Sequence, residues 1–271
     1  MKELTKEQEL EIIRLYTKER RGQLYCAKQV VGLSNPKYTI EVLHKYNIPV
    51  RNQSEAAGLS NKNREKHKNK DYFKNPNHNM AWLMGFIAAD GTIRKNSNEI
   101  KIGLSIKDKE ILEKIKDELE LETNVKEYTT TDGFDCCTLR WTCKEHKKDL
   151  AKYSIIPQKT FLLKPPLELP QEYWIDYIRG YFDGDGSVNL IQGKNLRWQV
   201  CSATKEIIEW IIDELNRLGV PPVNVQKQTG PNEPLYYCQY STNSTKKIFD
   251  ILYTPNSLKL ERKYQHFQEI L

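Results

Sequence analysis

Residues 83–91 read LMGFIAADG, and residues 178–186 read IRGYFDGDG. Both stretches run from apolar residues through a glycine, an aromatic residue and two or three further residues to an Asp-Gly pair. The two Asp-Gly pairs lie 95 residues apart. A motif that recurs together with its surrounding pattern indicates an internal duplication, and it shows where each copy begins.

The residues around each motif predict one order of elements twice. In the first copy we expect a helix over 80–89, a strand over 99–106, a helix over 107–120, two strands around Asp132-Gly133 and a helix that ends near Tyr153. In the second copy we expect a helix over 172–183, strands around Gln192-Gly193, a helix over 204–218, two strands around Gly230-Pro231 and a helix that ends near Tyr253. The expected fold class is therefore α+β, with two pseudo-symmetric αββαββα halves of antiparallel strands over 80–165 and 166–271.

Each motif carries two small residues four positions apart, a spacing that places both on one face of a helix. The pairs are Gly85 with Ala89 and Gly180 with Gly184. Because short side chains let two backbones approach closely, we expect the motif helices to pack face to face. Asp90 and Asp185, the residue after each pair, would then lie side by side.

Two adjacent carboxylates repel each other unless a divalent cation neutralises them. Oxygen ligands suit Mg²⁺, or Mn²⁺, so Asp90 and Asp185 are candidate metal ligands, with the backbone carbonyls of Ala89 and Gly184 to complete the coordination. Metal ions held by such acids promote phosphodiester hydrolysis. A calcium-binding loop fails on the spacing of its ligands, and a plain helix stop stays open for one copy.

The strands alternate between apolar and polar residues, so each sheet should have one face on helices and one in solvent. Long polar side chains on the solvent face can reach base edges in a DNA groove. The candidates are Lys101, Ser105, Lys126, Thr138 and Arg140 in the first copy, and Arg197, Gln199, Gln226, Gln228 and Gln239 in the second.

Residues 1–52 predict a small all-α domain. A helix should begin after Thr5, and a helix, a turn at Gly32 and a second helix from residue 35 or 36 follow the helix-turn-helix layout. Lys37, Tyr38 and Thr39 would then face DNA. The first 75 residues hold 16 Lys and Arg against 9 Asp and Glu, while the whole chain has a net charge of +6. This basic end favours a polyanionic partner, although a helical bundle without a DNA role stays open.

Residues 53–79 are rich in Asn and Lys, which is typical of a basic linker. No run of apolar residues is long enough to cross a membrane, and the first residues do not resemble a signal peptide. The six cysteines form no CxxC pair, which argues against zinc and disulfide frameworks. We therefore expect an intracellular, cytoplasmic protein that is not secreted.

The two nine-residue motifs and the order of elements resemble the LAGLIDADG homing endonucleases over residues 80–271. The resemblance implies a monomer with saddle-shaped sheets that cuts both strands of a long, specific DNA target with a divalent metal, and it assigns the metal to Asp90 and Asp185. It also implies a lysine near the end of each half. These are Lys159 in the first half and Lys263 or Lys259 in the second. Ala88 replaces an acid that many members carry there, but that position is not the metal ligand.

The N-terminal segment resembles, more weakly, helix-turn-helix modules attached to nucleases of mobile elements. Two other roles use the same fold. One is a DNA-binding transcription regulator without catalysis, but such regulators usually lack the two acids, whereas Asp90 and Asp185 are both present here. The other is an intron maturase, which would bind RNA on the same surface. An intein is not expected, because the chain has neither a splicing nucleophile at its start nor a His-Asn end. His78 alone does not make an HNH nuclease.

Overall fold

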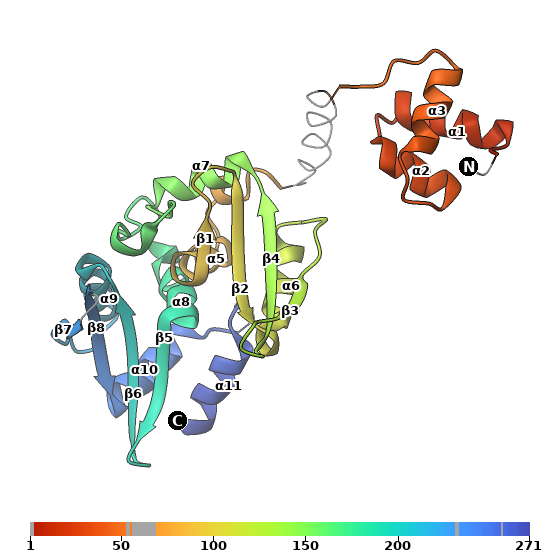
Figure 1. Cartoon of the computed structure of the whole chain (residues 1–271). Helices are drawn as coiled ribbons and strands as arrows, with labels where there is room; N and C mark the ends of the chain where they lie inside the picture. The colour runs from red at the N-terminus through yellow and green to blue at the C-terminus, as the bar shows by residue number, and fades with distance from the viewer. Residues whose placement is uncertain (1–2, 53–54, 56–68, 231–232, 256) are drawn as a thin grey trace. The chain divides into compact units, whose positions relative to one another are not determined.

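The computed structural model describes residues 3–52, 55, 69–230, 233–255 and 257–271. The chain divides into two compact units, Met1–Lys66 and His67–Leu271 (Figure 1). Most of the predicted linker, residues 53–54 and 56–68, lies outside the described residues. Its last part does not behave as a linker, because Tyr72 and Phe73 are buried in the core of the second unit. Their large aromatic side chains supply apolar area that a solvated tether lacks.

The first unit includes the helices α1 (Lys6–Thr17), α2 (Gln23–Val31) and α3 (Lys37–Lys45). The Thr5 side chain caps α1 as predicted, and it forms a capping box with Gln8. Gly32 ends α2 with φ of +76°, a conformation that glycine adopts without strain. Ile12 and Leu43 are buried in the small core that the three helices share.

The second unit contains the duplicated elements. The first repeat consists of η1 (Tyr72–Lys74), α5 (His78–Asp90), β1 (Gly91–Ile93), β2 (Glu99–Ser105), η2 (Ile106–Asp108), α6 (Lys109–Glu118), β3 (Lys126–Thr129), β4 (Asp135–Thr142) and α7 (Lys144–Lys152). The short helix η3 (Lys159–Phe161) ends the first repeat, and the second consists of η4 (Gln171–Tyr173), α8 (Trp174–Asp185), β5 (Gly186–Ile191), β6 (Asn195–Ser202), α9 (Lys205–Arg217), β7 (Gln226–Gly230), β8 (Glu233–Ser241), α10 (Thr242–Leu252) and α11 (Glu261–Ile270). The predicted αββαββα order is confirmed, while α11 was not predicted.

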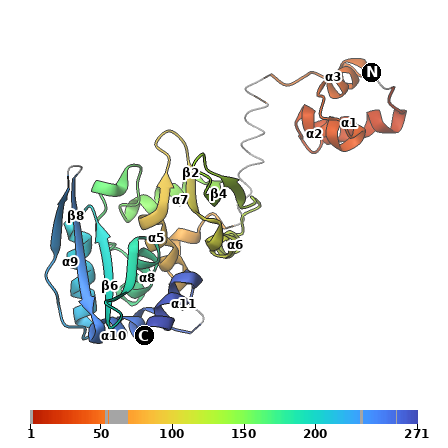
Figure 2. The same ribbon diagram turned by 60° about the horizontal axis from the view of Figure 1, so that its bottom comes forward.

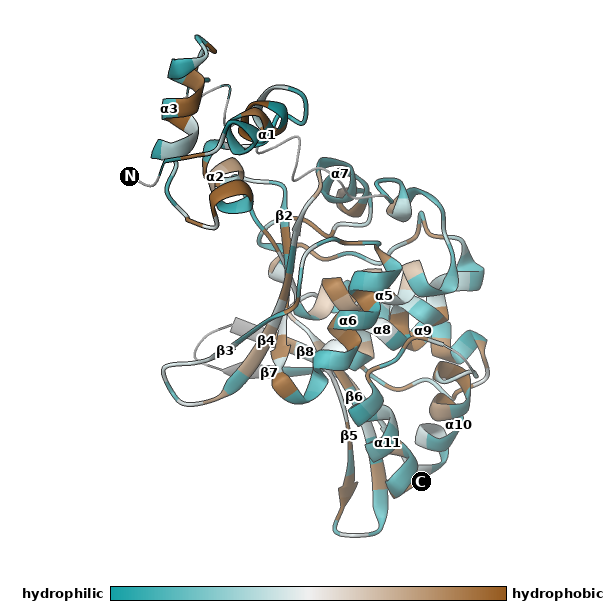
Figure 3. Cartoon of the chain, turned by 90° about the vertical axis from the view of Figure 1, so that its right-hand side faces the viewer, coloured by the Kyte–Doolittle hydropathy of each residue, from teal (hydrophilic) through white to brown (hydrophobic). Residues whose placement is uncertain are grey.

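The two four-stranded sheets have the same antiparallel topology, with strand orders β1-β2-β4-β3 and β5-β6-β8-β7. Their registers also correspond, because Gly91 pairs with Ile102 and Gly186 pairs with Val200, and each glycine is the last residue of its motif. The strands lie on one side of the unit and α6, α9, α10 and α11 on the other (Figure 3). The duplication therefore yields two equivalent sheets, each covered by helices on one face only.

Helices α5 and α8 lie side by side between the two sheets (Figures 1 and 2). Every residue from Met80 to Ala88 is buried, which explains why α5 is apolar on all sides and not amphipathic. The side chain of Asn77 accepts a hydrogen bond from the Met80 amide and begins the helix. In the described residues no helix is long and apolar enough to span a membrane.

Candidate active site

The glycines of the two motifs stand where α5 and α8 cross. A β-carbon on Gly85 would lie 2.0 Å from the Tyr177 carbonyl oxygen, and one on Gly180 would lie 1.9 Å from that of Trp82. At the end of the crossing, a β-carbon on Gly184 would lie 2.4 Å from that of Ala89. The face-to-face packing predicted from the small residues is confirmed.

Asp90 and Asp185 are the last residues of α5 and α8, and the close crossing brings them together. The Asp90 Oδ2 atom lies only 3.3 Å from the place that a β-carbon on Gly184 would take. Loss of solvation and, to a smaller extent, the charge of Asp90 together raise the pKa of Asp185 to about 6, against the opposing effect of Lys159 and Lys263. Partial burial also raises the pKa of Asp90. Both carboxylates still reach solvent, so a substrate can approach them.

One lysine lies at each helix end. Lys159 Nζ donates a hydrogen bond of 2.5 Å to the Gly91 carbonyl, directly after α5. Lys263 Nζ donates to the carbonyls of Phe182, Asp183 and Gly186 at 2.7 to 2.8 Å, at the end of α8, and the Gly184 carbonyl oxygen lies 3.3 Å from it. Burial lowers the pKa of both lysines. The alternative, Lys259, places its Nζ over the Tyr264 ring at 4.4 Å, so Lys263 is the second lysine at the site.

Asp183 is buried away from this surface, although it stands only two residues before Asp185. Its carboxylate accepts hydrogen bonds from Trp82 Nε1 and the Tyr253 hydroxyl, both at 2.8 Å, and from the Leu260 amide at 3.0 Å. Burial raises the pKa of this carboxyl. Asp183 therefore ties α8 to α5 and to the chain segment before α11.

Sequence reasoning missed Arg262 and Asp108, which join the two repeats beside the site. The Arg262 guanidinium donates two hydrogen bonds of 2.9 Å to the buried Asp108 carboxylate. A bidentate pair of this kind fixes orientation as well as distance. It holds α11, and hence the neighbouring Lys263, against the first repeat. The spacing of Tyr264, Phe267 and Ile270 was the available signal for α11.

The site suits a divalent cation in its donor chemistry. Within the described residues no three His, Cys, Asp or Glu side chains gather at one point, so Asp90 and Asp185 would be joined by backbone, water and substrate oxygens. Carbonyls in the last turn of a helix lack partners within it, as at Ala89. The Gly184 oxygen is already shared, because Lys263 Nζ lies 3.3 Å away. Loss of solvation raises the pKa of both carboxyls, and a bound cation would stabilise their charged forms.

Nearly all sheet residues predicted to face DNA lie on the face without helices. Gln199 and Gln239 are half-buried and joined by a 2.7 Å hydrogen bond from Gln239 Nε2 to Gln199 Oε1. The half-buried or exposed members also include Lys101, Ser105, Lys126, Arg140, Arg197, Gln226 and Gln228. Thr138 was wrongly predicted, because its side chain is buried and its hydroxyl donates to the Ile102 carbonyl.

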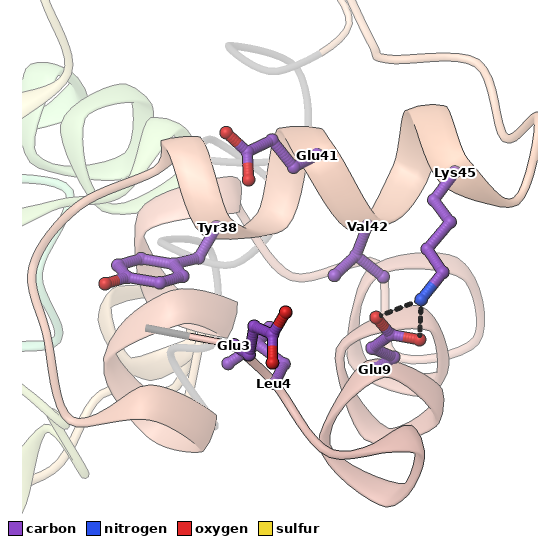
Figure 4. A pocket seen from close by; sticks show the side chains of 7 residues that line it. All are labelled: Glu3, Leu4, Glu9, Tyr38, Glu41, Val42 and Lys45. Carbon is purple, nitrogen blue, oxygen red and sulfur yellow. Dashed lines mark hydrogen bonds and ion pairs between the residues drawn. The ribbon is translucent and has the colours of Figure 1, made fainter. Parts of the chain in front are cut away.

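Two residues of α3 were also wrongly assigned to a DNA-facing surface. Thr39 is fully buried and donates its hydroxyl to the Gln23 carbonyl, and Tyr38 is 6% exposed. Both lie on the side of α3 that packs on α1 and α2, whereas Lys37 is exposed. The pocket beside α3 is acidic and therefore unsuited to phosphate (Figure 4). It is lined by Glu3, Leu4, Glu9, Tyr38, Glu41, Val42 and Lys45, of which Lys45 and Glu9 form an ion pair of 2.6 Å.

Comparison with known proteins gives a family and several relatives. The family model described as LAGLIDADG-like domain matches residues 77–153 and 172–266. The uncharacterized protein MJ0314 of Methanocaldococcus jannaschii is 22% identical over 191 residues, 66% of this chain and 66% of its own. The chain thus spans just under two thirds of that relative. The uncharacterized protein MJ0398 of the same organism is 25% identical over 219 residues, which are 77% of this chain and 73% of that protein.

Solved structures with a similar fold include full-length DUF199/WhiA from Thermotoga maritima and the homing endonuclease I-WcaI bound to its DNA recognition sequence. The first is 14% identical with a TM-score of 0.47, and the alignment covers 74% of this chain and 63% of that one. The second is 18% identical with a TM-score of 0.47, and the alignment covers 72% of this chain and 91% of that one.

Proposed function

Because this chain belongs to the LAGLIDADG-like domain family, we propose that it is a site-specific double-strand DNA endonuclease, a homing endonuclease. One observation carries the proposal. Asp90 and Asp185 lie together at the ends of two crossing helices, and each helix end also holds a partly buried lysine. A packing role would not require two solvent-accessible acids with raised pKa values at matched places.

Asp90 and Asp185 would hold the divalent metal, Mg²⁺ or Mn²⁺. When bound there, the cation would neutralise charge on the scissile phosphate and polarise its oxygens. The acids must be ionised for this role, and the pKa of Asp185 near 6 leaves that carboxyl mostly charged at neutral pH. Because water is the nucleophile in this hydrolysis, the chain need not supply a Ser, Cys or His nucleophile.

Lys159 and Lys263 are assigned to the water and phosphate oxygens. Backbone carbonyls fix the position of each Nζ atom, so the ammonium group is oriented before DNA arrives. Burial lowers the pKa of each lysine, so each gives up its proton more readily than a lysine in solvent. In its neutral form Nζ would take a proton from the attacking water, and in its ammonium form it would give one to the leaving oxygen.

Double-stranded DNA is the proposed partner, and one chain supplies both halves of the site. The two faces without helices carry cationic and amide side chains, the groups that contact base edges and phosphates. Lys37 and the basic N-terminal unit would add contacts to the DNA backbone through tethering. This unit is proposed as a helix-turn-helix module on the strength of its three short helices and the Gly32 turn.

The test is cleavage-site selection by the full chain from randomised and genomic DNA libraries. With Mg²⁺ we expect double-strand breaks at one long sequence, and with Ca²⁺, which takes more ligands in a looser geometry, binding to that sequence without efficient cutting. Specific binding without breaks in Mg²⁺ or Mn²⁺ would favour a DNA-binding regulator instead. Breaks spread over unrelated sequences would contradict site specificity.

A further inference from the structure

Two rows of side chains occupy equivalent places on the two sheets. The first-sheet row is Thr92, Lys101 and Arg140, which are register partners across β1, β2 and β4. The second-sheet row is Ser187, Gln199 and Gln239, which are register partners across β5, β6 and β8. Thr92 comes two residues after Asp90, and Ser187 comes two residues after Asp185. Each row therefore begins at the same distance along the chain from its acid.

The first-sheet row is cationic. Lys101 and Arg140 lie directly opposite each other on adjacent strands, where like charges destabilise a sheet. Lys101 leans along β2 toward Gly103, since its Nζ lies 4.0 Å from where a β-carbon on Gly103 would stand. Gly103 thus leaves room for the ammonium on the side nearer Asp90. Two donors without acceptor capacity suit a partner that presents two acceptors.

The second-sheet row is neutral and its two amides are joined. Gln239 Nε2 donates to Gln199 Oε1 at 2.7 Å, which holds both side chains in one orientation. Gln199 can still donate through its Nε2, and Gln239 can still accept through its Oε1. The joined pair therefore presents a donor beside an acceptor, unlike the two donors of the first-sheet row.

In the major groove, guanine presents two acceptors, N7 and O6, while adenine presents an acceptor, N7, and a donor, the N6 amino group. On the basis of the proposed function, we propose that the two half-sites of the target differ at equivalent positions, with guanine read by Lys101 and Arg140 and adenine read by Gln199 and Gln239. The pseudo-symmetric protein then binds an asymmetric target.

The positions of the rows favour bases over phosphates. β2 and β4 are the two central strands of the first sheet, and β6 and β8 are those of the second. Phosphates flank the groove, so the edge strands of a sheet laid in it lie nearer to them. Lys126 on β3 and Gln226 and Gln228 on β7 occupy those edges.

The test is binding-site selection from a randomised duplex library with the full-length Asp185→Asn variant, so that binding is measured without cleavage. We expect guanine in one half-site and adenine in the other, equally far from the centre. Adding Lys101→Gln and Arg140→Gln should lower the preference for that guanine about tenfold or more and leave the adenine half-site unchanged. Lys148→Gln on the exposed surface of α7 removes a charge away from the sheet face, and it should leave both preferences unchanged.

Two results would overturn the inference while leaving the proposed function standing. One is a selected target without guanine and adenine at matched positions. The other is a double variant that binds every sequence more weakly by the same factor, with a smaller salt dependence, because that is the behaviour of phosphate contacts. A selection that enriches no sequence at all would contradict the proposed function together with this inference.

Discussion

Gly180 of α8 lies against the Trp82 carbonyl of α5 so closely that a β-carbon would stand 1.9 Å from its oxygen. We predict that Gly180→Ala forces the helices apart and lowers the free energy of unfolding by about 3 kcal/mol or more, since backbone cannot yield as a flexible side chain does. Gly103→Ala is the control, because its β-carbon would have only ordinary contacts of 3.5 Å and more. Denaturant unfolding measures both, and equal stabilities would contradict the account of the crossing.

Substitution of Asp183 should affect stability, whereas substitution of Asp185 should affect cleavage. Asp183→Ala leaves the Trp82, Tyr253 and Leu260 donors without their acceptor, so we expect a loss of about 3 kcal/mol or more in the free energy of unfolding. Below its lowered melting temperature the variant should still cleave DNA. A normal melting temperature with no cleavage would place Asp183 in the chemistry.

The stability of the metal-free protein should depend on the ionisation of Asp185. Its pKa is raised to about 6 in the folded state, so the folded state binds the proton more tightly, and stability is lost as pH rises from about 4 through 6. Asp185→Asn should therefore be more stable than the native protein at pH 7.5 in EDTA and equal to it near pH 4. Since the carboxylate reaches solvent, we expect less than about 1 kcal/mol. Melting curves at both pH values measure this, and a native protein that is the more stable at pH 7.5 would contradict it.

Removal of the first unit should separate binding from folding. Deleting residues 1–66 should weaken DNA binding and reduce the slope of affinity against salt, because fewer counterions are released, while cleavage at the same site persists. Deleting residues 1–75 should also destabilise the second unit, because it removes the buried side chains of Tyr72 and Phe73. Binding titrations over a range of salt concentrations and thermal melts measure the two effects. An unchanged slope would show that the first unit does not touch DNA.

The sequence was sufficient to predict the duplicated fold, the helix crossing and the meeting of Asp90 with Asp185. Short-range patterns carry these features, since a repeat, a four-residue spacing of small residues and strand alternation are each local. The family membership that the motifs indicated is confirmed.

Features that depend on long-range packing could not be predicted. Asp108 meets Arg262 across 154 residues, and the choice between Lys259 and Lys263 depends on where α11 packs. Tyr38 and Thr39 were misplaced because the start of α3 alone does not say which side meets the other helices. Tyr72 and Phe73 were assigned to the linker because the residues around them are mostly polar, and the average composition of a segment does not show that two aromatic residues in it are buried.

The central claim is that Asp90 and Asp185 form one metal-dependent centre at the helix crossing. The most direct measurement is single-turnover cleavage of the selected target by the native chain, Asp90→Asn, Asp185→Asn and the nearby control Asp183→Asn, with Mg²⁺ and with EDTA. We predict that the native chain and the folded control cut both strands only with Mg²⁺, and that each of the other two variants loses at least about 100-fold in rate while still binding the target. Cleavage by Asp185→Asn at the native rate, or unchanged cleavage in EDTA, would contradict the account.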